Sequence, residues 1–436
     1  MTNNIFSNQS NETVKNKTLS NTISLYVLTI AKIIFPLITL PYLTRVLTKD
    51  CYGVVSYVKA FMVYSQLIVD FGFILSSVKD IVEAKGDKDI IGLIAGHTFL
   101  SKVILSIGAF VLTLIVSLCL PILKNYFFYT MLSFLAVFLS CFLADFLFMG
   151  VEKMHFISLV FVIMKGLALG LTFVLVKNDS NIIWIPTLDV VSTLVAILIT
   201  YLIIKTQLKI KIRINSILAS LKMIKKSFFY FISNMATTAF GALNTLLIGI
   251  FILDPSQIAY WTVCNTVVSA VQSLYSPITS GIYPHMIRHK NLSYIHKALL
   301  LIMPILFTGG IAGFFMSKLV LRILGGPGYV EAYWVLRSLI PLLIISFPAM
   351  LYGWPTLGAI GKVKETSITT ILAAVCQVLG LFILILINQF TLINIAILRF
   401  VTELIMLCSR AFITYKHKSL FKSDNNPHNG TIETNE

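Results

Sequence analysis

The chain has 436 residues, of which 57% are hydrophobic and only 12% are charged, whereas soluble proteins have roughly 45–50% apolar and about 25% charged residues. This composition excludes a water-soluble fold. The net charge is +16, but the basic residues lie among long apolar runs. Enrichment of lysine and arginine in the cytoplasmic loops of membrane proteins explains this excess without a nucleic-acid partner.

Apolar runs long enough to cross a bilayer as a helix, about 20 residues each, recur along the whole chain. The expected spans are, in order, 22–44, 53–75, 92–120, 127–149, 156–176, 183–204, 228–252, 259–283, 298–321, 333–356, 367–387 and 391–413. The predicted fold class is therefore an all-α integral membrane protein with twelve transmembrane helices in the lipid bilayer.

Basic residues outside these spans gather in alternate connections, most densely in segment 205–227. Because lysine and arginine mark the cytoplasmic side of a membrane protein, both termini are predicted in the cytoplasm. The N-terminal tail 1–21 is polar and lacks a short apolar region followed by a small-residue cleavage site. No cleavable signal peptide is therefore expected.

Segment 205–227 falls midway along the chain, and we interpret it as a basic cytoplasmic linker that forms a helix on the inner membrane surface. It separates an N-lobe, 22–204, from a C-lobe, 228–413, and a cytoplasmic tail follows at 414–436. Six spans per lobe give both lobes the same orientation. This predicts a parallel pseudo-two-fold repeat about an axis along the membrane normal, as in alternating-access transporters.

Polar side chains follow one face of several predicted spans. In the second span they fall within an arc of roughly 80° at 100° per residue, and in the eighth the arc is about 100°. The second-span stripe comprises Ser56, Lys59, Gln66, Asp70 and Ser77, and the eighth-span stripe comprises Thr262, Asn265, Ser269, Gln272, Ser276 and Thr279. The first span with Lys32 and the seventh with Asn234 and Asn244 repeat the pattern.

Polar side chains in hydrocarbon face the bundle interior or water, so these four spans predict one shared cavity. The alternative is a dry interface in which small polar residues join the helices. Lys32 and Lys59 favour the cavity, because a lysine in a dry interface would lack a solvating partner.

Several local motifs carry a family resemblance over about residues 20–415. They are PYLTRVL at 41–47, YG at 52–53, DFGF at 70–73, KDI at 79–81, FMGVEKM at 148–154 and GGPGY at 325–329. In these motifs the chain resembles Wzx-type polysaccharide flippases of the multidrug/oligosaccharidyl-lipid/polysaccharide exporter superfamily. It departs from the lipid II flippases by lacking an extra pair of C-terminal spans, and it has Leu253-Asp254-Pro255 where a glycine is common.

The resemblance implies two lobes around a central cavity in the bacterial cytoplasmic membrane, and the excess of basic over acidic residues within the spans predicts that this cavity is cationic. The implied cargo is a polyprenyl (undecaprenyl) diphosphate-linked oligosaccharide, turned from the inner to the outer leaflet during synthesis of capsule, O-antigen or a related polymer. A polysaccharide polymerase and export machinery are the implied protein partners. No cofactor, metal or catalytic residue is expected.

A diphosphate-sugar head group carries at least two negative charges, and it crosses hydrocarbon only with cations and water beside it. We therefore expect Lys32 and Lys59 to bind the phosphates, helped by Arg337. Neutral amides are expected to bind the sugar hydroxyls, namely Gln66, Asn234, Asn244, Asn265 and Gln272. The alternative for the two lysines is structural pairing with a carboxylate such as Asp70.

Four other charged residues within the spans are considered separately from the cargo ligands. Asp70 and Asp145 are candidates for binding a proton or cation that drives the transport cycle. Lys165 has no partner evident from the sequence, and Lys102 is interpreted as structural because its stem can reach the membrane surface.

Two other classes of function stay open. A membrane glycosyltransferase or polysaccharide polymerase would also be polytopic and basic, but such enzymes usually need a sizeable loop or domain, and every predicted outward loop is short. A multidrug antiporter would favour an acidic cavity for cationic drugs, whereas the predicted interior is basic.

Overall fold

The computed structural model describes residues 2–238 and 240–421, and every regular element in these residues is a helix. Ten helical stretches of the described residues are long and apolar enough to cross a membrane. They correspond in order to the first six and the last four of the expected spans. Helices such as α14 (Leu292–Leu324) also expose large apolar side chains, including Leu300, Leu301 and Phe315. The chain is a multi-pass membrane protein.

The expected seventh and eighth spans fall on shorter or more polar helices. These are α10 (Ile217–Thr238), α11 (Ala242–Phe251), α12 (Pro255–Ser273) and α13 (Tyr275–His289). Lysines at the start of α10 and the polar stripe of α12 lower the mean hydropathy, and α11 has only 10 residues. Twelve spans in two lobes therefore stay a prediction.

The chain divides into two compact units. The first comprises the described residues up to Val263 together with Ile323–Gly328, and the second comprises Cys264–Arg322 together with the described residues from Tyr329 onward. Besides α10 and α11, the first unit contains α1 (Thr2–Val46), α2 (Lys49–Asp70), α3 (Phe73–Glu83), α4 (Lys88–Cys119), α5 (Pro121–Asn125), α6 (Phe127–Ser140), α7 (Asp145–Gly150), α8 (Met154–Leu175), η1 (Asp179–Asn181), α9 (Trp184–Ile203) and η2 (Ile204–Leu208). Helix α12 begins in this unit and ends in the second.

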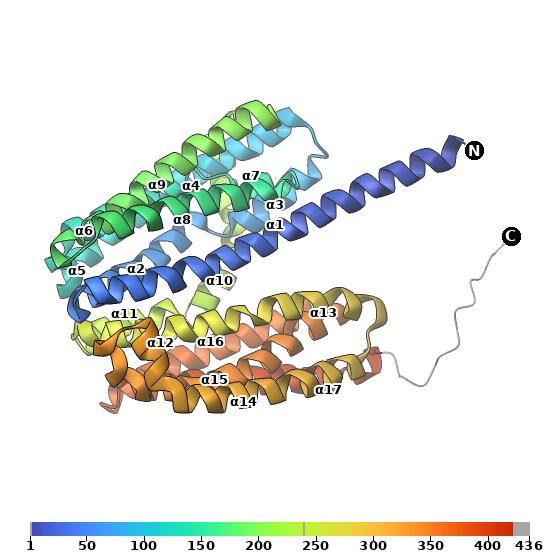
Figure 1. Cartoon of the computed structure of the whole chain (residues 1–436). Helices are drawn as coiled ribbons and strands as arrows, with labels where there is room; N and C mark the ends of the chain where they lie inside the picture. Colours follow the sequence, from blue (N-terminus) through green and yellow to red (C-terminus); the bar gives the residue numbers. More distant parts are fainter. Residues whose placement is uncertain (1, 239, 422–436) are drawn as a thin grey trace. The chain divides into compact units, whose positions relative to one another are not determined.

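The second unit is also helical (Figure 1). Besides α13 and most of α14, it contains α15 (Tyr333–Leu351), η4 (Tyr352–Leu357), η5 (Gly358–Ile360), α16 (Val363–Leu386), α17 (Leu392–Lys416) and η6 (Lys418–Leu420), and η3 (Pro327–Ala332) lies at its boundary with the first unit. Buried apolar residues such as Met286, Ile295 and Phe347 form its core. The predicted tail 414–436 is described only to residue 421, and its remainder lies outside the described residues.

Only part of the linker 205–227 is helical, because residues 205–208 belong to η2 and residues 217–227 to α10. Residues 209–216 form no helix, and their backbone packs against α4. A Cβ atom added at Gly92 would lie 2.1 Å from the Lys211 carbonyl oxygen, and one at Gly96 would lie 2.0 Å from that of Arg213. The Arg213 amide donates to the Gly92 carbonyl over 3.1 Å. Two glycines one helical turn apart thus form a groove on α4 that holds an extended segment.

The glycine groove gives a testable prediction. Gly96→Ala should lower the melting temperature of the purified protein, because the new methyl group overlaps the Arg213 carbonyl. Gly108→Ala on the same helix meets open space and should be neutral or stabilising, since alanine is favoured over glycine inside a helix by roughly 0.5–1 kcal/mol. Equal melting temperatures for the two variants would contradict the groove.

Candidate functional site

The segment Asp70-Phe71-Gly72-Phe73 breaks the second predicted span into α2 and α3. Phe71 and Gly72 have left-handed backbone angles, with φ values of 40° and 78°, and such residues end a helix. The Phe71 ring stacks on Phe231 of α10 at a centroid distance of 4.4 Å. The break therefore fixes Asp70 at the carboxyl end of α2, beside α10.

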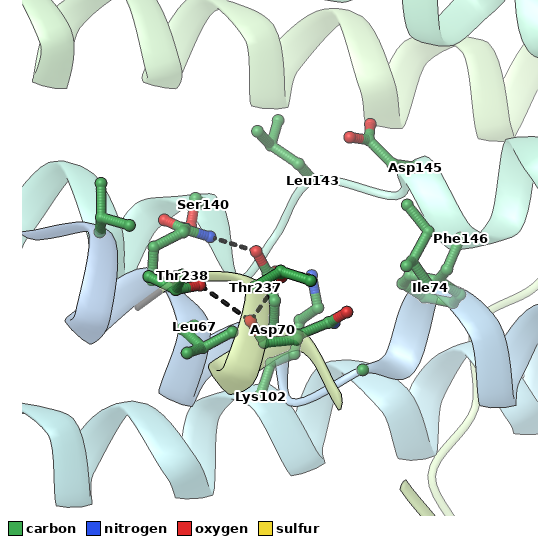
Figure 2. A pocket seen from close by; sticks show the side chains of 14 residues that line it. Leu67, Asp70, Ile74, Lys102, Ser140, Leu143, Asp145, Phe146, Thr237 and Thr238 are labelled. Atoms are coloured by element: carbon green, nitrogen blue, oxygen red, sulfur yellow. Dashed lines mark hydrogen bonds and ion pairs between the residues drawn. The ribbon is translucent and has the colours of Figure 1, made fainter. Parts of the chain in front are cut away.

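Asp70 accepts hydrogen bonds from two side chains (Figure 2). Lys102 of α4 donates from Nζ to Oδ1 over 3.0 Å, and Gln66 donates from Nε2 to Oδ2 over 2.8 Å. Ser140, the last residue of α6, donates its hydroxyl to Gln66 Oε1 over 3.1 Å. Lys102 is only 7% exposed. Its buried ammonium group therefore depends on the Asp70 carboxylate.

A cavity of about 400 Å³ opens beside this cluster, and we call it the Asp70 cavity. Its polar lining residues are Gln66, Asp70, Lys102, Ser140, Asp145, Asn234, Thr237 and Thr238. Asp145 begins α7 and lies apart from the hydrogen-bonded group in Figure 2. Thr237 and Thr238 both donate to the Asn234 carbonyl, over 2.8 and 2.9 Å. The lining holds two carboxylates and one ammonium group, so it favours a cation.

A second cavity of about 450 Å³ lies among α2, α6, α8 and α9, and we call it the Lys59 cavity. It shares Gln66 and Ser140 with the Asp70 cavity. Its charged lining residues are Lys59, Lys165 and Asp189, and Lys165 Nζ lies 3.3 Å from Asp189 Oδ1. The Lys59 cavity therefore carries an excess of positive charge.

Five of the residues predicted from the sequence line these two cavities. They are Lys59, Gln66, Asp70, Asp145 and Asn234. Two others belong to the same unit but line neither cavity. Lys32 is exposed on α1, and its Nζ lies 5.8 Å from the centre of the Phe161 ring. Asn244 is fully buried on α11, and its amide donates to the Phe240 carbonyl over 3.1 Å.

The other three predicted residues belong to the second unit. Gln272 donates to the Ser346 hydroxyl over 2.7 Å, and Asn265 is half-buried on α12. Arg337 on α15 donates from Nε to the Phe314 carbonyl and to the Ser317 hydroxyl, each over 3.0 Å. Its guanidinium lies over the rings of Phe314, Tyr333 and Trp334. These contacts position Arg337 within its own unit.

Two lysines gain partners that the sequence did not reveal. Lys102 pairs with Asp70, the carboxylate named above as an example of a partner for Lys32 or Lys59. Lys165 pairs with Asp189 of the following helix. The sequence contained one indication of this pair. Lys165 and Asp189 are single charged residues inside consecutive apolar spans, and a charge there needs a partner or water.

Comparison with known proteins decides the family. Residues 18–290 match the family described as "Polysaccharide biosynthesis protein". The chain belongs to this family. A protein of Escherichia coli named "Putative O-antigen transporter" is 26% identical over 83% of this chain and 88% of its own length. A protein of Shigella dysenteriae with the same name is 27% identical over 83% of this chain and 91% of its own length.

Solved structures show the same fold. An inward-facing MATE family multidrug transporter of the MOP superfamily aligns with a TM-score of 0.66 and 16% identity, covering 89% of this chain and 99% of its own. A eukaryotic MATE transporter aligns with a TM-score of 0.59 and 13% identity, covering 92% of this chain and 96% of its own. The resemblance to polysaccharide flippases is confirmed, and the relatives indicate a transporter instead of an enzyme.

The Asp70–Lys102 pair can be tested by a double-mutant cycle. Asp70→Asn should destabilise the purified protein by about 3 kcal/mol, because it leaves a buried ammonium group without its counter-ion. Lys102→Met should cost less, since the Asp70 side chain is 47% exposed and the cavity can solvate it. The double variant should be more stable than Asp70→Asn alone. Additive losses in thermal unfolding would show that the two groups do not interact.

Proposed function

We propose that the protein is a flippase for polyprenyl (undecaprenyl) diphosphate-linked oligosaccharide, which it moves from the inner to the outer leaflet. It acts in the bacterial cytoplasmic membrane with both termini in the cytoplasm. Two six-span lobes, 22–204 and 228–413, alternate access to the two sides. The family match and the relatives named as O-antigen transporters support a polysaccharide cargo.

The observation that carries this proposal is a pair of adjoining charged cavities inside an otherwise apolar helix bundle. A cationic drug would need only the acidic Asp70 cavity, whereas a diphosphate head group cannot leave water without compensating positive charges such as those of the Lys59 cavity. Lys59 is the proposed phosphate ligand in these cavities, and Gln66 and Asn234 supply amides for sugar hydroxyls. Lys32, Arg337, Asn244, Asn265 and Gln272 stay proposed cargo ligands outside them.

Charge reversal of Lys59 tests the proposal. In proteoliposomes with a defined lipid-linked oligosaccharide, Lys59→Glu should reduce accessibility of the cargo on the far leaflet at least tenfold, because a carboxylate repels the diphosphate. Lys124→Glu on α5 changes a surface lysine outside both cavities and serves as the matched control. Normal flipping by Lys59→Glu at equal protein content would remove Lys59 from the cargo path.

We also propose that the Asp70 cavity binds the proton or cation that resets the transport cycle. Its two carboxylates face one ammonium group, so a second positive charge can be held beside Asp145. Asp145→Asn should then make flipping insensitive to imposed gradients. Flipping by the native protein that stays unchanged after both proton and sodium gradients are collapsed would contradict coupling.

A further inference from the structure

Lys59 is the exposed residue in an otherwise buried stretch of α2. Residues 51–58 and 60–62 are buried, whereas the Lys59 side chain opens into the Lys59 cavity. No carboxylate of the described residues lies within ion-pair distance of its Nζ. The carboxylate that lines this cavity, Asp189, already pairs with Lys165, so the cavity keeps one ammonium charge in excess that water or an entering anion can compensate.

Lys165 faces the same cavity but already has a partner. Its Nζ lies 3.3 Å from Asp189 Oδ1, and the two side chains are 39% and 34% exposed. A partly exposed ion pair of this kind adds little stability and is open to exchange. Asp189 sits in α9, one turn before Thr193, whose hydroxyl donates to the Asp189 carbonyl over 2.6 Å. The backbone that carries the carboxylate is thus an ordinary turn of α9 beside the cavity.

We infer that the Lys59 cavity is a phosphate-binding site in which Lys59 and Lys165 bind the anion and Asp189 is an exchangeable counter-ion. Asp189 holds Lys165 when the cavity contains water, and it releases the ammonium group when phosphate oxygens approach. This inference rests on the proposed function, since the phosphate is that of the lipid-linked cargo.

The dimensions and the neutral lining residues suit a diphosphate. A volume of about 450 Å³ admits a diphosphate with its water but not a complete oligosaccharide. Tyr129 and Ser133 of α6 add hydroxyl groups to the lining. Gln66, which lines both cavities, donates to Asp70 and accepts from Ser140. The phosphate site therefore adjoins the proposed cation site through one amide side chain.

Direct binding tests the inference without any flipping. The purified full-length protein in nanodiscs is titrated with inorganic pyrophosphate at low salt, and binding is followed by calorimetry. Lys59→Gln and Lys165→Gln should each weaken binding about tenfold. Lys165→Arg, which keeps the charge, should retain most of it. Lys124→Gln is the matched control and should bind as the native protein does.

Asp189→Asn separates the proposed exchange from a purely structural ion pair. Removing the competing carboxylate should tighten pyrophosphate binding severalfold, whereas a structural pair would lose affinity or fold on removal. Weaker binding by a folded Asp189→Asn variant, or unchanged binding by both lysine variants, would overturn the inference. Glucuronate is titrated in parallel, and tighter binding of this carboxylate sugar than of pyrophosphate would overturn the assignment to phosphate.

The two proposals fail in different ways. Lysine-dependent pyrophosphate binding by a protein that flips no lipid-linked oligosaccharide would keep the phosphate site and reject the cargo. Normal flipping together with pyrophosphate binding that ignores Lys59 and Lys165 would keep the flippase and reject the site. Thermal unfolding of each variant, measured in the same nanodiscs, shows whether a loss of binding is a loss of fold.

Discussion

A charged side chain among apolar helices requires an opposite charge or water within reach, and the ion pair of Lys102 with Asp70 meets this requirement in the first unit. Asp70 accepts from Lys102 at the carboxyl end of α2. Gln66 extends the same cluster to Ser140, where α6 also stops. Two interrupted helices are thus joined by side-chain hydrogen bonds, and both cavities open beside the interruption.

The two cavities have opposite charge excess although they share Gln66. Neighbouring sites of opposite sign lower the electrostatic cost of each, because an anion in one favours a cation in the other. Such an arrangement lets a head group and an accompanying ion enter together with little net charge. An excess of basic residues counted over the whole predicted interior therefore does not show that one cavity has a negative excess and the other a positive excess.

Composition and periodicity were sufficient for the fold class and for the positions of ten membrane-spanning stretches, because hydrophobic length is a local property. They also placed Lys59, Gln66 and Asp70 on one polar face of α2, as the helical repeat requires. They could not give the partner of Lys102 or Lys165, since the pairs cross from α4 to α2 and from α8 to α9. Composition and periodicity also could not predict that the backbone of 209–216 packs on α4. Two glycines on a helix indicate a close contact, but they do not identify the segment that makes it.

The packed linker segment bears on how the chain is assembled from two halves. The predicted lobes are joined by segment 205–227, whereas the division of the chain into compact units falls inside α12, after Val263. Helices α10 and α11 therefore belong by sequence to one half and by packing to the other. A linker that only joined two lobes would be free to vary in length. Residues 209–216 of this linker pack against α4. Insertions there would disrupt packing within the first unit and should be poorly tolerated in evolution.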